Sequence, residues 1–129
     1  LATRANLQAF LVMGLTSLYI VGYIGLIFWP TGPIVWLWAV VIGVGQAVFP
    51  VIMTLIGLKA TSVESTAGLS AFTQSWGYLF AALGPFAIGL LHATSGSWTV
   101  PLLVLIFLAA IQIVVGWFVI REPSLRLVP

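Results

Sequence analysis

The sequence predicts an all-α, polytopic membrane protein with four transmembrane helices. Apolar residues make up 62% of the 129 residues, and charged residues make up only 5%, against about a quarter in a typical soluble domain. All of the charged residues lie outside four long apolar runs. These runs cover residues 8–29, 33–57, 67–91 and 99–120.

Each run is long enough to cross a bilayer as a helix. The runs contain roughly 22 to 25 residues, and about 20 residues at a rise of 1.5 Å span the hydrocarbon core. Since lipid offers no hydrogen-bond partners, the backbone has to pair with itself, which makes α-helix the expected structure. The first run, 8–29, is too long for the apolar part of a signal peptide and is expected to stay in the membrane. The last run carries a single amide, Gln112, as a peripheral helix would.

The second and third runs contain signals for close packing and kinks. In 33–57, Gly43 and Gly45 permit close helix contact, and Pro50 removes a backbone hydrogen bond, so we expect a kink there. In 67–91, small residues spaced by four and three form one face on which another helix can pack, directly before a proline. This face consists of Gly77, Ala81 and Gly84, followed by Pro85.

The basic residues predict the orientation of the chain. Arg4 precedes the first run, Lys59 follows the second, and Arg121 and Arg126 follow the fourth, so all four fall on one side of an even number of spans. Lys and Arg concentrate in cytoplasmic loops. We therefore expect both ends of the chain in the cytoplasm, with a cytoplasmic loop at 58–66 and a cytoplasmic tail at 121–129.

A few polar side chains inside the spans are the candidate substrate-cavity residues. Gln46 is the only amide of the second run, and Ser70, Gln74 and Tyr78 lie at i, i+4 and i+8 on one helix face. A rise of 1.5 Å per residue places Gln46 and Tyr78 roughly 16 to 18 Å from the inner boundary. Transporter substrate sites lie at this depth. Amides at this depth also serve as hydrogen-bonding contacts between helices, and the residues alone leave both roles open.

The composition argues against other classes of function. Six charged residues outside the runs and one His do not assemble a catalytic constellation or a metal site, so no enzyme, metal or cofactor is predicted. A net charge of +2 from so few groups forms no nucleic-acid patch. His92, in a turn with Thr94, Ser95 and Ser97, is expected to be a solvated boundary residue. The predicted partners are the lipid bilayer and a small-molecule substrate.

From residue 40 to the end of the fourth run, the chain resembles the C-terminal part of major facilitator superfamily transporters, and most of all their cyanate and nitroimidazole porter branch. The resemblance lies in the order and spacing of three short patterns. These are GQ-x-x-FP (Gly45, Gln46, Phe49, Pro50), Gly77-Tyr78 leading to Gly84-Pro85, and the Gly96-Ser97-Trp98 turn.

The resemblance implies a C-terminal fragment of a secondary transporter, namely the last four of twelve helices, in the inner membrane. It implies alternating access, with a small anion such as cyanate as the solute and the remaining transporter helices as partners. It also implies that the second and third helices line the central cavity. Gln46, Ser70, Gln74 and Tyr78 would then face the translocation path.

Two alternatives remain open at this point. One is a complete four-helix membrane protein that exports as a dimer, as small multidrug exporters do. Such exporters use a glutamate within the membrane, whereas Glu64 and Glu122 lie in the predicted cytoplasmic segments. The other alternative is a non-transporting assembly or anchor subunit, for which small-residue packing faces would suffice.

Overall fold

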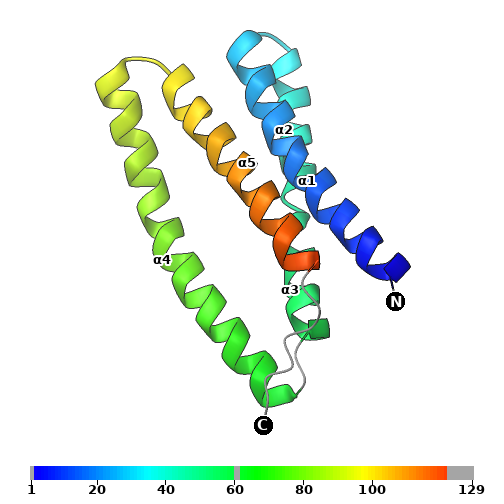
Figure 1. Cartoon of the computed structure of the whole chain (residues 1–129). Helices are drawn as coiled ribbons and strands as arrows, with labels where there is room; N and C mark the ends of the chain where they lie inside the picture. The colour runs from blue at the N-terminus through cyan, green and yellow to red at the C-terminus, as the bar shows by residue number, and fades with distance from the viewer. Residues whose placement is uncertain (1, 60–61, 122–129) are drawn as a thin grey trace.

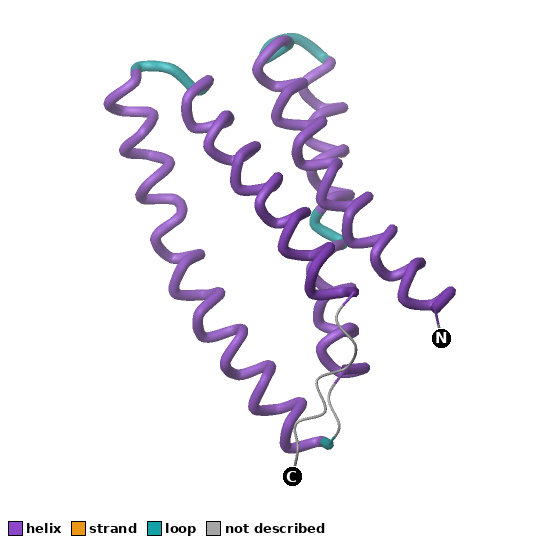
Figure 2. Tube along the Cα trace, viewed as in Figure 1, coloured by secondary structure: helices purple, strands orange, loops and turns teal. Residues whose placement is uncertain are grey.

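The computed structural model describes residues 2–59 and 62–121, and nearly all of them are helical. No strand occurs within these two ranges (Figure 2). The helices follow one another through short connections (Figure 1). They are α1 (Ala2–Phe28), α2 (Ile34–Gly45), α3 (Val48–Lys59), α4 (Val63–Ser95) and α5 (Thr99–Arg121).

The helices provide four stretches that are long and apolar enough to cross a membrane, which confirms the predicted number. The second stretch combines α2 and α3 across a short interruption. The stretches are Leu7–Phe28, Ile34–Leu55, Thr66–Ser95 and Thr99–Val119. The protein is therefore a multi-pass membrane protein with an all-α fold.

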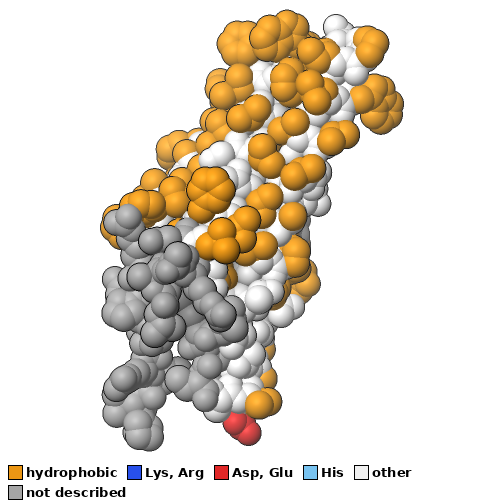
Figure 3. Space-filling model, turned by 90° about the vertical axis from the view of Figure 1, so that its right-hand side faces the viewer, with side chains coloured by type: hydrophobic (Ala, Val, Ile, Leu, Met, Phe, Trp, Pro, Cys, Tyr) orange, Lys and Arg blue, Asp and Glu red, His pale blue; other side chains and the backbone are white. Residues whose placement is uncertain are grey.

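The surface of the bundle suits hydrocarbon better than water. Large apolar side chains are widely exposed, among them Phe10 (73%), Trp36 (76%) and Phe86 (72%). Hydrophobic side chains cover much of the face seen in Figure 3. Soluble monomers rarely expose a continuous apolar surface of this extent.

The connections alternate between the two ends of the bundle. The start of α1, the end of α3, the start of α4 and the end of α5 lie at one end, and the α1–α2 and α4–α5 turns lie at the other (Figure 1). Gly32 and Gly96 in these two turns have φ values of 79° and 66°, a conformation that glycine adopts without strain. The predicted cytoplasmic segments fall partly outside the described residues, at 60–61 and 122–129.

Helix α1 is the centre of the packing, with α5 along one side and α2 along another. Glycines bring α1 and α2 together, because a Cβ added at Gly22 would overlap Ile42 and one added at Gly25 would overlap the Trp38 indole. Further along, a Cβ at Gly45 of α2 would lie 3.1 Å from the backbone oxygen of Leu15. Small residues of this kind let membrane helices approach closely.

The second span is interrupted between α2 and α3. The N–H of Ala47 donates to the oxygen of Val44 (3.1 Å), and the N–H of Phe49 donates to the oxygen of Gln46 (3.1 Å). Both bonds reach back three residues, as in a tightened helical turn. The interruption precedes Pro50, whose ring would clash with the carbonyl four residues earlier in a continuous helix. The single kinked helix expected over 33–57 is thus two shorter helices.

Helix α4 touches the bundle sparsely, through α3 and α5. It continues through Pro85 as one helix of 33 residues. No atom of another described segment lies within 4 Å of a Cβ added at Gly77, Gly84 or, in α2, Gly43. The small-residue face predicted on this helix is therefore not packed against the helices described, and its role as a packing face stays a prediction.

Candidate functional site

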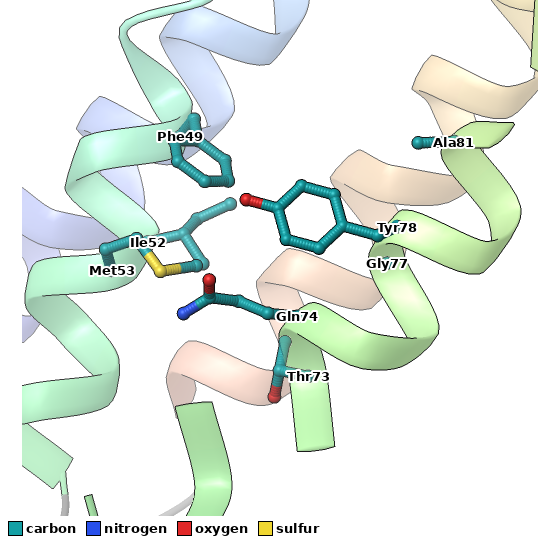
Figure 4. A pocket seen from close by; sticks show the side chains of 8 residues that line it. All are labelled: Phe49, Ile52, Met53, Thr73, Gln74, Gly77, Tyr78 and Ala81. Atoms are coloured by element: carbon teal, nitrogen blue, oxygen red, sulfur yellow. The ribbon is translucent and has the colours of Figure 1, made fainter. Parts of the chain in front are cut away.

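A cavity of about 370 Å³ lies between α3 and α4. Three side chains of α3 form one wall, and five residues of α4 form the other (Figure 4). They are Phe49, Ile52 and Met53 from α3, and Thr73, Gln74, Gly77, Tyr78 and Ala81 from α4.

The helical repeat explains why these residues share the cavity. On α4, Gln74, Tyr78 and Ala81 follow one another at spacings of four and three and therefore occupy one face. On α3, Phe49 and Ile52 are three residues apart, which places them on one face as well. Because Gly77 has no side chain, the backbone of α4 forms the cavity wall at that position.

Two hydrogen-bonding groups enter an otherwise apolar space. In Figure 4, the Tyr78 ring and the Gln74 amide both extend from α4 toward the α3 wall, with Phe49 and Ile52 opposite the Tyr78 hydroxyl. Gln74 is half-buried, and Tyr78 is 64% exposed. Neither makes a hydrogen bond to another residue of the described ranges, so both groups are available to a solute.

The lining carries no charged side chain. Its groups are aromatic rings, aliphatic chains, a thioether, an amide and two hydroxyls, which bind by shape and hydrogen bonds. A transferred ion would find no countercharge among them. Within residues 2–59 and 62–121, no group of three His, Cys, Asp or Glu residues is placed to hold a metal ion.

The structure brings two of the four predicted cavity residues together. Gln74 and Tyr78 line the same space, whereas Ser70 and Gln46 do not line it. Ser70 lies one turn before Gln74 on α4. Gln46 lies exposed at the interruption between α2 and α3, where its N–H donates to the oxygens of Ile42 and Gly43 (both 3.2 Å).

Sequence reasoning did not assign Phe49, Ile52, Met53 or Thr73 to the cavity. Three of them are apolar and give no polar signal within an apolar run. Phe49 belongs to the GQ-x-x-FP pattern, in which Gln46 is the residue predicted to face the cavity. The helix is interrupted before α3, so the repeat of 3.6 residues does not continue from α2 into α3. The residues of α3 that face α4 therefore cannot be predicted by extending a face of α2.

Two curated bacterial transporters match this chain over 107 residues, which is 82% of it. The Bacillus subtilis (strain 168) protein YycB, named as an uncharacterized transporter, is 38% identical, and the 2-nitroimidazole transporter of Escherichia coli (strain K12) is 36% identical. The chain spans 27% of the length of each relative.

No protein-family model matches the chain, and no solved structure matches it significantly. The two transporter matches agree with the four apolar spans of the structure. The chain is therefore similar to part of two bacterial transporters, one of them a 2-nitroimidazole transporter, which agrees with the predicted resemblance to the nitroimidazole porter branch.

Proposed function

We propose that this chain forms part of a secondary transporter and supplies one wall of its substrate path. The cavity between α3 and α4 supports this proposal most directly, because it offers an amide and a hydroxyl without partners inside an apolar span. Polar groups within the membrane are costly and therefore mark solute pathways more often than lipid-facing surfaces. The transporter relatives support the same activity.

The solute that we propose is a small uncharged heterocycle of the nitroimidazole type rather than cyanate. The name of the Escherichia coli relative supports this class. The absence of charge on the cavity lining supports it as well, because an anion moved into an apolar site without a countercharge pays a large desolvation cost. A ring can lie against Phe49 while the Gln74 amide and the Tyr78 hydroxyl bind its polar edge.

The packing supports alternating access as the mechanism. Glycines hold α2 firmly on α1, whereas α3 carries the cavity wall beyond the interruption at Gln46. In this proposal the last four of twelve helices contribute this wall, and the remaining transporter helices complete the path. The basic residues around the spans support an orientation with both ends of the segment on the cytoplasmic side of the inner membrane.

Uptake measurements test the site. We expect Gln74→Leu to reduce uptake of radiolabelled 2-nitroimidazole at least tenfold at equal membrane abundance, because it removes the amide and keeps the size of the side chain. Gln8→Leu makes the same chemical change near the start of α1, outside this cavity, and is expected to leave uptake unchanged. Equal uptake in the two variants would contradict the assignment, and cyanate uptake without nitroimidazole uptake would contradict the solute class.

A further inference from the structure

A second cavity lies between α1 and α5, on a helix pair that the proposed substrate path does not use. It has a volume of about 190 Å³ and shares no lining residue with the α3–α4 cavity. Tyr19 and Tyr23 line it from α1, and Gln112 lines it from α5. The rest of the lining is apolar and consists of Leu105, Leu108 and Ala109.

The polar groups of this cavity lack hydrogen-bond partners among the described residues, whereas the polar side chains next to them on α1 have them. The Thr16 hydroxyl is fully buried and donates to the oxygen of Val12 (2.7 Å), and the Ser17 hydroxyl donates to the oxygen of Met13 (2.7 Å). By contrast, the hydroxyls of Tyr19 and Tyr23 and the amide of Gln112 make no hydrogen bond to any residue in 2–59 or 62–121.

These three groups belong to the apolar stretches Leu7–Phe28 and Thr99–Val119. At 1.5 Å per residue, Tyr19 lies roughly 18 Å along the helix from Leu7, deep in the span. An amide or hydroxyl that is transferred from water to hydrocarbon without a hydrogen-bond partner is strongly destabilised. An occupant that supplies hydrogen bonds would remove this cost for three side chains at once.

We propose that the α1–α5 cavity is a second binding site, which takes a small uncharged molecule consisting of one ring and one hydrogen-bonding group. The lining has no charged residue, which excludes a strong ion site. Its volume equals that of about six water molecules at 30 Å³ each, which is enough for a single ring. Tyr19 and Tyr23 stack on each other at 6.0 Å between ring centroids and form a preassembled aromatic wall.

Binding of 4-fluorophenol to the purified protein in lipid nanodiscs tests the proposal. The ¹⁹F NMR signal is titrated against protein-free nanodiscs, which correct for partition of the probe into lipid. We expect saturable binding to the protein. Tyr23→Phe and Gln112→Leu are each expected to raise the dissociation constant about fivefold, the effect of losing one hydrogen bond.

A matched control tests whether a loss of binding is specific to this cavity. Gln8→Leu makes the same chemical change as Gln112→Leu at a residue that lines neither cavity, and it is expected to leave probe binding unchanged. Leu108→Trp adds bulk at a side chain that is 52% exposed, so it should fill the cavity and abolish binding while the protein still elutes as a folded species.

Three results would overturn the proposal. One is the absence of saturable binding above the protein-free nanodiscs. Another is weakening by Gln8→Leu as large as that by Gln112→Leu. The third is saturable binding that Leu108→Trp leaves intact, because the probe would then bind outside this cavity.

Discussion

The imidazole of His92 and the indole of Trp98 stack across the turn between α4 and α5, with ring centroids 4.0 Å apart and ring planes 15° apart. The N–H of Gly96 donates to the oxygen of His92 (2.9 Å) and closes the same turn. His92 was expected to be a solvated boundary residue. It is half-buried instead, and its Nδ1 is buried without a partner among the described residues.

The stack is expected to hold the end of α4 against the start of α5, where α4 has few other contacts. Trp98→Ala should lower the free energy of unfolding by about 1 kcal/mol, because an aromatic pair contributes roughly that much beyond burial. Thermal unfolding in detergent measures the effect. Trp36→Ala is the control, since Trp36 is 76% exposed and stacks on no ring among the described residues. An equal loss in both variants would contradict a role for the stack.

The glycines between α1 and α2 are expected to be essential for packing. Gly25→Ala would push a methyl group into the Trp38 indole, and overpacking of this kind costs about 1 to 3 kcal/mol. Gly14→Ala makes the same change where no neighbouring atom lies within 4 Å, so it should be neutral or stabilising. The melting temperatures of the two variants test this prediction. A Gly25→Ala protein as stable as the Gly14→Ala protein would show that α1 and α2 are not in close contact.

The interruption at Gln46 and Ala47 is expected to depend on Pro50. Pro50→Ala removes the ring that clashes with the carbonyl of Gln46 and restores an N–H, so α2 and α3 should join into one helix. Slower amide hydrogen exchange at residues 47–49 would report this change. Pro33→Ala, at the exposed start of α2, should leave exchange at residues 47–49 unchanged. If exchange is also unchanged in Pro50→Ala, packing on α1 imposes the break.

Cysteine labelling tests whether the α3–α4 cavity is open to water. The chain has no cysteine, so each introduced thiol is its only one. We expect Cys at positions 74 and 78 to react with a water-soluble thiol reagent, and Cys at position 70 to react if the path extends one turn further toward the start of α4. Val114→Cys is the control on an exposed apolar face of α5; reaction there as fast as at 74 would remove the distinction between path and lipid face.

Much of the fold could be predicted because the order of apolar and charged residues along the chain shows which segments enter the membrane. Four apolar runs without charges specify four spans, and successive spans place their connections alternately at two ends. The polar stripe with Gln74 and Tyr78 was visible for the same reason, since a helix repeats every 3.6 residues. These local patterns do not show which helix packs opposite α4. Phe49, Ile52 and Met53 of α3 were therefore not predicted to lie beside Gln74 and Tyr78.

The sequence by itself determined that this protein lies in lipid, how many times it crosses, and which of its few polar groups lie within the spans, because these properties follow from transfer free energies summed along single helices. Only the tertiary structure decided which glycines make close contact, namely Gly22, Gly25 and Gly45. It also decided that Gln46 and Ser70 lie outside the cavity that Gln74 and Tyr78 share. Which helices pack together, and which face each helix turns toward its partner, depends on contacts between segments that are far apart in the sequence. These contacts cannot be deduced from the residues of one helix.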